Sequence, residues 1–133
     1  MRVGDYVRNK YGIAKVIDIE NNNGIDILVF DNPICFLVNK ETGEIKDDRL
    51  LNRLAIIDGV DVSKIKSSPN IIDLIEVGDY VNSHKVIYTA GEKHKLVYVE
   101  YVNMDKLLEV KSYQIKSIVT KEQFEEMEYK IDD

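Results

Sequence analysis

Cysteine, histidine and long apolar runs are scarce in this chain of 133 residues, and each scarcity excludes a class of protein or site. Cys35 is the only cysteine, so an internal disulfide and a thiolate metal cluster are excluded. It lies between apolar neighbours in PICFLV, and we therefore expect a buried, inert thiol. No apolar run approaches the roughly 20 residues that a membrane-spanning helix needs. The first residues show a strand-like pattern rather than an apolar signal core, so we expect a cytoplasmic location.

Motifs for catalysis, nucleotide binding and metal binding are also missing. The two histidines, His84 and His94, fall in a predicted loop and a predicted turn, and no Gly-x-Ser-x-Gly motif accompanies them. The glycines are scattered singly, which disfavours a phosphate-binding loop, and no Asp-x-Asp-x-Asp-Gly calcium loop surrounds the acidic pairs. We therefore predict a protein that is not an enzyme and that holds no metal or cofactor. A catalytic role for either histidine is the alternative.

One five-residue string, VGDYV, occurs at 3–7 and again at 77–81. In both copies an Ile-Lys-Ser follows later, at 65–67 and at 115–117. Two motifs repeated in the same order indicate a duplicated small module. The first copy is longer between its two motifs, which places an insertion near residues 20–55.

Glycine and aspartate occupy the same places in both copies of the repeat. Gly4 and Gly78 supply a permissive backbone at the entry to a strand. Asp5 and Asp79 can accept backbone N–H groups and fix a bend there. A catalytic role for either aspartate is the alternative, but two equivalent bends explain two equivalent aspartates more simply.

A helix-start signal follows each Ile-Lys-Ser. Ser68 can cap a helix that has a proline at its first position, leading into NIIDLI. Thr120 and Gln123 have the spacing of a capping box in front of a short C-terminal helix. We therefore predict two domains, 1–68 with the insertion and 69–133 with the C-terminal helix.

Short strand-like segments dominate both predicted domains. Alternating apolar and β-branched residues predict strands at 12–19, 25–30, 34–39, 84–90, 95–102 and 107–118. Turn-forming residues predict reversals at Asn21–Gly24, Glu41–Glu44, Ala90–Glu92 and Asn103–Asp105. Strands at intervals of about 8–12 residues are typical of barrels and sandwiches. We therefore predict a mostly β protein with short helices, built from two tandem small barrels, the first with an insertion.

Two parts of the sequence resemble known proteins. VGDYVRNKYGIAKVIDI is similar to the opening of an SH3-like small barrel of the KOW type. IKSSPNIIDLIEVGDYVN and IKSIVTKEQFEEMEYKI resemble small uncharacterised phage or prophage proteins of low-GC Gram-positive bacteria. The resemblance covers residues 1–19 and 64–131, and the segment from about 20 to 60 departs from it. It implies tandem SH3-like barrels in a phage accessory protein that binds a host protein, such as an anti-defence or anti-CRISPR-type inhibitor, and it carries over no functional residue.

Charge and surface pattern favour a protein partner. The formal net charge is −6, and residues 69–133 hold 8 Lys and Arg against 13 Asp and Glu. In the C-terminal helix, Phe124, Met127 and Ile131 have helical spacing and form a stripe whose alternative role is packing on its own barrel. The acidic face of that helix consists of Glu122, Glu125, Glu126 and Glu128. We predict that this face binds a partner with a basic groove, such as a nucleic-acid-handling enzyme.

Nucleic-acid binding is the alternative function. A cluster of aromatic and basic side chains in the first copy could stack bases and pair with phosphates. It consists of Tyr6, Arg8, Lys10, Tyr11 and Lys15. The net negative charge of the chain opposes this interpretation.

Overall fold

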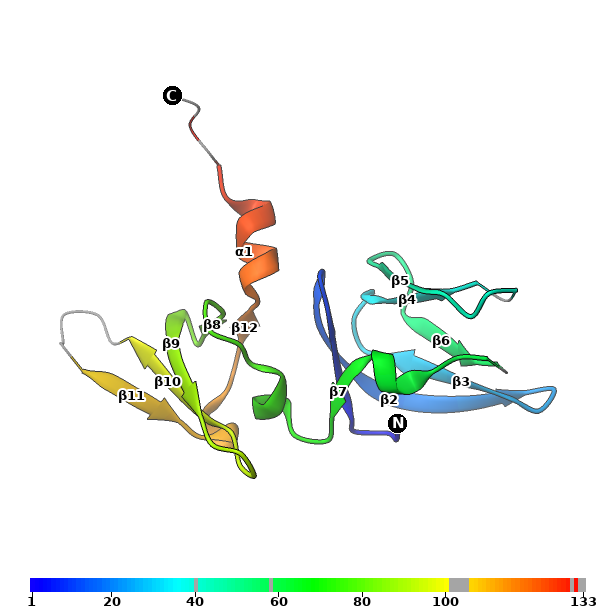
Figure 1. Cartoon of the computed structure of the whole chain (residues 1–133), viewed down its shortest axis with the longest axis horizontal. Coiled ribbons are helices and arrows are strands. Elements are labelled where there is room, and N and C mark those ends of the chain that lie inside the picture. Colours follow the sequence, from blue (N-terminus) through cyan, green and yellow to red (C-terminus); the bar gives the residue numbers. More distant parts are fainter. Residues whose placement is uncertain (40, 58, 101–105, 130, 132–133) are drawn as a thin grey trace. The chain divides into compact units, whose positions relative to one another are not determined.

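The computed structural model describes the chain except for residues 40, 58, 101–105, 130 and 132–133 (Figure 1). Of the described residues, 46% are in strands and 14% in helices, so the protein is mostly β, and a curled sheet forms a half-barrel. The chain divides into two compact units, Met1–Leu74 (unit 1) and Ile75–Asp133 (unit 2), so the boundary follows residue 74. Among the described residues, no helix has the length and apolar character needed to cross a membrane.

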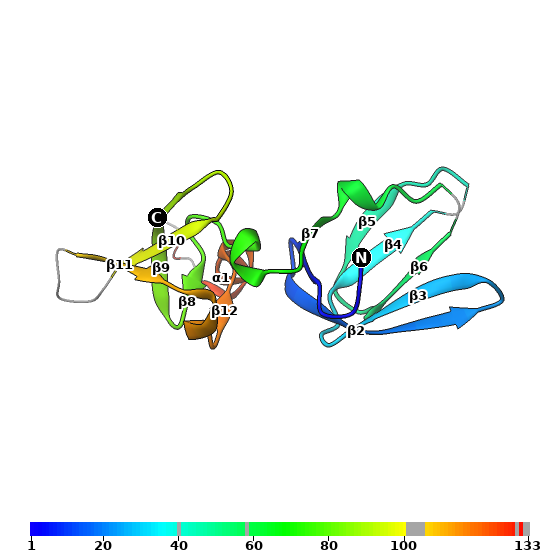
Figure 2. The ribbon, with the colours of Figure 1, turned by 90° about the horizontal axis from the view of Figure 1, so that it is seen from below.

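Unit 1 contains a five-stranded antiparallel sheet in the order β6-β3-β2-β1-β7. Its strands are β1 (Tyr6–Asn9), β2 (Gly12–Asn22), β3 (Ile25–Phe30), β6 (Arg53–Ile56) and β7 (Lys66–Ser68). The long β2–β3 ribbon closes at Asn23 and Gly24, whose φ angles of 54° and 82° are the left-handed values that Asn and Gly adopt most easily (Figure 2). The predicted turn is thus confirmed, and β3 has the predicted bounds.

A separate hairpin of β4 (Cys35–Val38) and β5 (Ile45–Asp48) lies between β3 and β6 in the sequence. It belongs to unit 1 because its buried apolar side chains join the hydrophobic core that the sheet provides. The core residues are Val7, Ala14, Val16, Leu28, Phe30, Ile34, Cys35, Phe36, Leu54 and Ile65. Burial of this apolar surface is the main force that holds the hairpin on the sheet.

Unit 2 contains a second five-stranded antiparallel sheet, in the order β11-β10-β9-β8-β12 (Figure 1). Its strands are β8 (Tyr80–Val81), β9 (His84–Ala90), β10 (Leu96–Glu100), β11 (Leu107–Val110) and β12 (Ile118–Val119). The order is that of unit 1 without the β4–β5 hairpin. In both sheets three consecutive antiparallel pairs are followed by a last strand that pairs with the first.

The segment 107–118, predicted as one strand-like stretch, is interrupted. After β11 comes a short 3₁₀ helix, η3 (Ser112–Gln114), and only then β12. Unit 1 has a 3₁₀ helix at the same place, η1 (Val62–Lys64), in front of β7. Apolar alternation alone could not separate these elements, because a 3₁₀ turn is only three residues long. The predicted reversal at Asn103–Asp105 lies outside the described residues.

The two Val-Gly-Asp segments form the same bend. Gly4 and Gly78 have φ angles of 97° and 99°, a region that residues with a Cβ rarely adopt. The N–H of Gly4 donates to the carbonyl of Val16 at 2.8 Å, and that of Gly78 donates to the carbonyl of Val86 at 2.9 Å. Each bend therefore leads the chain into the first strand and fastens it to the second.

The aspartates close these bends from inside. The Oδ2 atom of Asp5 accepts the backbone N–H of Arg2 at 2.9 Å, and that of Asp79 accepts the backbone N–H of Glu76 at 2.8 Å. The prediction that both aspartates accept backbone N–H groups is confirmed.

The helix-start signals had different outcomes. α1 (Lys121–Met127) has Thr120 as its N-cap and the predicted capping box with Gln123. Ser68 caps no α-helix: it ends β7, and a 3₁₀ helix, η2 (Ile71–Leu74), begins three residues later. The predicted helical stripe was also wrong in part, because α1 ends at Met127 and its C-cap residue, Glu128, has an extended backbone, so Ile131 lies outside the helix.

Candidate interaction surfaces

The C-terminal helix is fixed to its own sheet at its N-terminus. The Oδ1 atom of Asp79 accepts the backbone N–H of Lys121 at 2.9 Å, and Asp79 is fully buried. The Lys121 ammonium group forms an ion pair with Glu76 at 2.8 Å. The bend of the second repeat thus satisfies an N–H group that the first turn of a helix leaves without an intrahelical partner.

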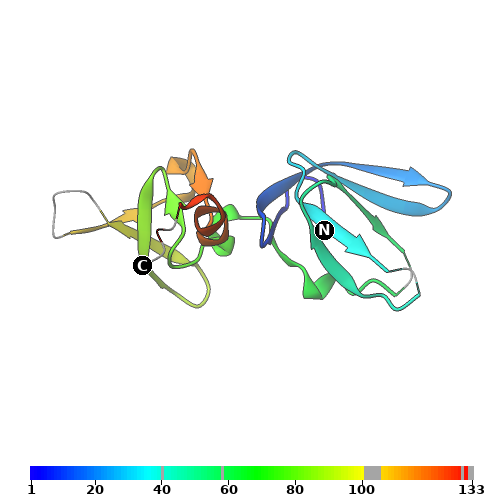
Figure 3. The ribbon, with the colours of Figure 1, turned by 90° about the horizontal axis from the view of Figure 1, so that it is seen from above.

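Beyond this anchor, α1 and the residues that follow it expose a series of apolar side chains. The Phe124 ring stacks on Tyr80 with a centroid distance of 4.8 Å, which leaves it 39% exposed. Met127, Tyr129 and Ile131 are 70%, 89% and 81% exposed. Within unit 2, α1 projects from β12, and Figure 3 looks nearly along its axis. We call Phe124, Met127, Tyr129 and Ile131 the C-terminal apolar segment.

Carboxylates alternate with these apolar side chains. Glu125, Glu126 and Glu128 are exposed, whereas Glu122 is only half-exposed. Glu122 and Glu126 also make interactions within the chain. Within α1, Glu122, Glu125 and Glu126 are spaced at i, i+3 and i+4 and share one face, whereas Glu128 follows the end of the helix.

The residues that were predicted to bind nucleic acid have different environments in the structure. Arg8 is 3% exposed, and its Nη1 atom donates to the carbonyl of Leu74 at 2.9 Å. Arg8 is therefore a structural residue, contrary to the prediction, because η2 packs over β1. Tyr6 and Lys15 face each other on paired strands, with the Lys15 ammonium 5.7 Å from the centre of the Tyr6 ring.

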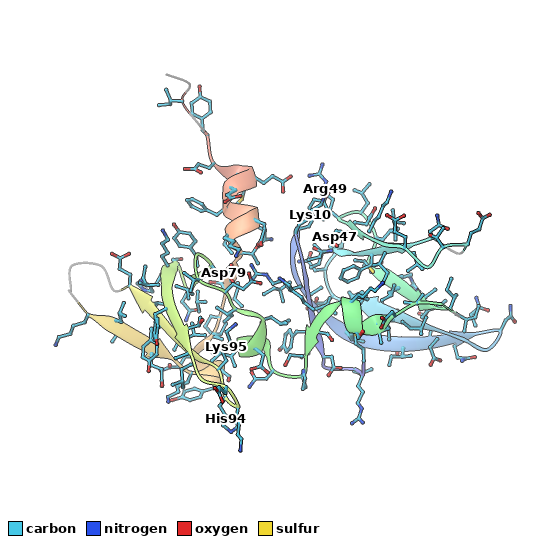
Figure 4. The ribbon with its side chains drawn as sticks, viewed as in Figure 1. Lys10, Asp47, Arg49, Asp79, His94 and Lys95 are labelled. Atoms are coloured by element: carbon cyan, nitrogen blue, oxygen red, sulfur yellow. The ribbon has the colours of Figure 1, made fainter. Side chains whose placement is uncertain are left out.

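Lys10 and Tyr11 lie instead in the β1–β2 turn, next to the β4–β5 hairpin. The Lys10 ammonium and the Arg49 guanidinium lie 5.0 Å and 5.8 Å from the centre of the Tyr11 ring. The backbone N–H of Lys10 donates to Asp47 at 3.1 Å, and Figure 4 shows Lys10, Asp47 and Arg49 together. Asn9 donates to the carbonyl of Cys35 at 2.8 Å. Sequence reasoning missed Arg49, since its contact with Tyr11 depends on how the β4–β5 hairpin folds back.

The chain matches no model of a known protein family, no curated protein and no solved structure. His94 lies in the β9–β10 turn beside Lys95, well separated from Asp79 (Figure 4), and His84 begins β9. Within the described part of the chain, no three His, Cys, Asp or Glu side chains are grouped so that they could hold a metal ion.

Cys35 is buried, as predicted. Its thiol donates to the carbonyl of Arg53 at 2.8 Å. Desolvation, with a smaller contribution from the carboxylate of Asp48, raises the pKa of this thiol to about 11. A thiol with such a pKa remains protonated at neutral pH, when it is a poor nucleophile.

Proposed function

We propose that the protein is a non-catalytic interaction protein that binds a partner protein through its C-terminal apolar segment. The observation that carries this proposal is the exposure of Met127, Tyr129 and Ile131, at 70%, 89% and 81%. Large apolar side chains grouped on a surface favour contact with another molecule, because their burial releases structured water. Tyrosine and methionine are also enriched at protein interfaces.

The charges around the segment define the partner. Glu125 and Glu128 are exposed beside these apolar side chains. A complementary surface therefore has an apolar groove with Lys or Arg at its rim, which would give salt-sensitive association. The resemblance to phage accessory proteins suggests that one such partner is a nucleic-acid-handling enzyme of the host, which the protein would inhibit in the cytoplasm. This part of the proposal rests on the sequence alone.

The fold we propose for each unit is an SH3-like barrel. The supporting observations are the shared strand order, in which the last strand pairs with the first, and the 3₁₀ helices η1 and η3 before β7 and β12. Small barrels of this kind host many unrelated functions, so the fold supports a binding module without specifying its ligand.

A capture experiment with matched variants tests the function. The tagged full chain is compared with a triple variant, Met127→Ser, Tyr129→Ser and Ile131→Ser, and with a control that carries Val3→Ser and Leu50→Ser. Val3 and Leu50 are exposed apolar residues of unit 1, at 58% and 82%. We expect one partner to be captured by the wild type and by the control but lost from the triple variant, and its purified form to bind more weakly as salt increases. Equal capture by all three proteins would show that the segment is not the binding surface.

Nucleic-acid binding remains the second candidate, and the observation that favours it is the Lys10, Tyr11 and Arg49 cluster. An aromatic ring flanked by two cations suits a stacked base and its phosphates. This candidate predicts that the protein is retained on single-stranded DNA or RNA at low salt. The double variant Lys10→Ala with Arg49→Ala should weaken this retention, whereas the exposed control Lys46→Ala should not. Absence of retention at low salt would eliminate it.

A further inference from the structure

The two sheets have equivalent rows of paired residues. In unit 1, Asp18 pairs with Val29 after a register shift in β2. In unit 2, Tyr88 pairs with Tyr98 beside a register shift at the same place, between β9 and β10. The preceding pairs also correspond, since Val16 faces Phe30 and Val86 faces Val99.

The third strand completes each row. Val29 pairs with Arg53 in unit 1, and Tyr98 pairs with Glu109 in unit 2. Unit 1 therefore has the row Asp18, Val29 and Arg53, whereas unit 2 has the row Tyr88, Tyr98 and Glu109. The bends and the preceding pairs correspond between the units, but this row differs. In unit 1 two charged residues flank the buried Val29, whereas in unit 2 two tyrosines lie in line with a glutamate.

The tyrosine row is accessible. Tyr88 is 54% exposed, and its ring lies 5.8 Å from that of Tyr98, with the two planes tilted by 38°. In the next row of the same face, Glu100 pairs with Leu107, which is 48% exposed. Glu109 forms an ion pair with Lys111 at the edge of the face. Two aromatic rings thus lie beside two carboxylates, Glu109 in the same row and Glu100 in the next row, on paired strands of one sheet.

We infer that the tyrosine row of unit 2 is a second interaction surface, which binds an arginine-bearing segment of a basic protein. The faces of tyrosine rings attract cations, and arginine is the cation most often found there, since its planar guanidinium stacks on the ring. Glu100 and Glu109 supply the carboxylates that pair with a guanidinium. The acidic balance of residues 69–133 draws a basic segment toward this unit rather than toward unit 1.

The surface is distinct from the C-terminal apolar segment, and its evidence is independent. It consists of side chains on β9, β10 and β11, whereas that segment follows β12. The inference therefore goes beyond the proposed function and has its own test.

Fluorescence anisotropy with three labelled peptides of equal length tests the inference on the full chain. The peptides alternate glycine with arginine, with lysine or with glutamate. We expect the arginine peptide to bind best, the glutamate peptide not to bind, and the affinity to fall with added salt. Tyr88→Ala should weaken binding of the arginine peptide about 2- to 30-fold, the range expected for loss of one cation–π contact.

Three further proteins make the result decisive. Tyr88→Phe keeps the ring and should bind within about twofold of the wild type, which separates stacking from loss of the fold. Val77→Ala shortens an exposed apolar side chain elsewhere in unit 2 and should leave binding unchanged. Asp18→Ala changes the equivalent position in unit 1 and should also have no effect. The inference is overturned if Tyr88→Ala binds like the wild type, or if Val77→Ala is equally impaired. It is also overturned if the glutamate peptide or a single-stranded oligonucleotide binds better than the arginine peptide.

Discussion

Asp79 and Lys121, which are 42 residues apart in the sequence, are joined by a hydrogen bond of 2.9 Å from the backbone N–H of Lys121 to Oδ1 of the buried carboxylate. The other oxygen of Asp79 accepts the backbone N–H of Glu76 at 2.8 Å. One side chain therefore closes the bend of the second repeat and holds the start of α1. The proposed C-terminal binding segment depends on this anchor for its position.

Replacing Asp79 by Asn should destabilise unit 2 by about 2 kcal/mol. Each carboxylate oxygen accepts one N–H, but an amide has only one oxygen, so its NH₂ group would face an N–H donor. Asp5→Asn is the matched control, and it should cost less than about 1 kcal/mol because Arg2 and Asp5 lie near the surface. Urea denaturation followed by circular dichroism measures both values. Equal losses would show that the contact with α1 contributes nothing.

The stack of Phe124 on Tyr80 should be the second anchor of α1. Phe124→Ala should reduce protection of the α1 amides in hydrogen exchange, because the helix is short and needs tertiary contacts. A double-mutant cycle with Tyr80→Ala should give a coupling free energy of about 0.5–1.5 kcal/mol. Met127→Ala, at a residue that is 70% exposed, is the control and should leave the exchange pattern unchanged. A coupling near zero would mean that the two rings only lie close together.

Local sequence signals gave much of this fold. The bends at Gly4 and Gly78 could be predicted because a glycine and an aspartate in sequence already restrict the backbone. The Thr120 capping box was also local, since its partner is three residues away. The mostly β character followed from alternation, which reflects the period of a strand.

The failures involve residues whose role depends on distant segments. Arg8 alternates as a surface residue of β1 would, yet η2 covers it, and no local pattern indicates that contact. Arg49 approaches Tyr11 only because β4 and β5 fold back on the sheet. Tyr88 and Tyr98 lie side by side only because of the pairing register of β9 and β10, which no local pattern indicates. Binding surfaces depend on such registers, and for that reason the sequence predicted the scaffold better than the sites.

Arg8 should behave as a stabilising residue rather than as a ligand for nucleic acid. Arg8→Met keeps the apolar stem but removes the donor to the carbonyl of Leu74, and we expect unit 1 to lose about 1.5–3 kcal/mol of unfolding free energy. Lys10→Ala, which changes an exposed cation in the adjacent turn, should cost less than about 0.5 kcal/mol. Thermal and urea denaturation of the two variants measure the difference. A stable Arg8→Met protein with impaired nucleic-acid retention would restore the original prediction for this residue.

The buried thiol of Cys35 should make the stability of unit 1 depend on alkaline pH. Its pKa is raised to about 11 from 9.0, so the folded state keeps a proton that the unfolded chain releases. The resulting contribution to stability is fully present below about pH 9 and is lost as the pH rises through 11.

Cys35→Ala separates this effect from the titration of tyrosines and lysines in the same range. We expect the variant to be less stable than the wild type at pH 8, because a buried side chain has been shortened. The difference in unfolding free energy should narrow between pH 8 and pH 10.5, since only the wild type has the thiol proton to lose. Urea denaturation at several pH values gives this difference, and slow alkylation of the folded wild type by iodoacetamide at pH 8 provides an independent check. A constant difference across this range, together with rapid alkylation, would mean that the thiol titrates as freely in the folded protein as in the unfolded chain.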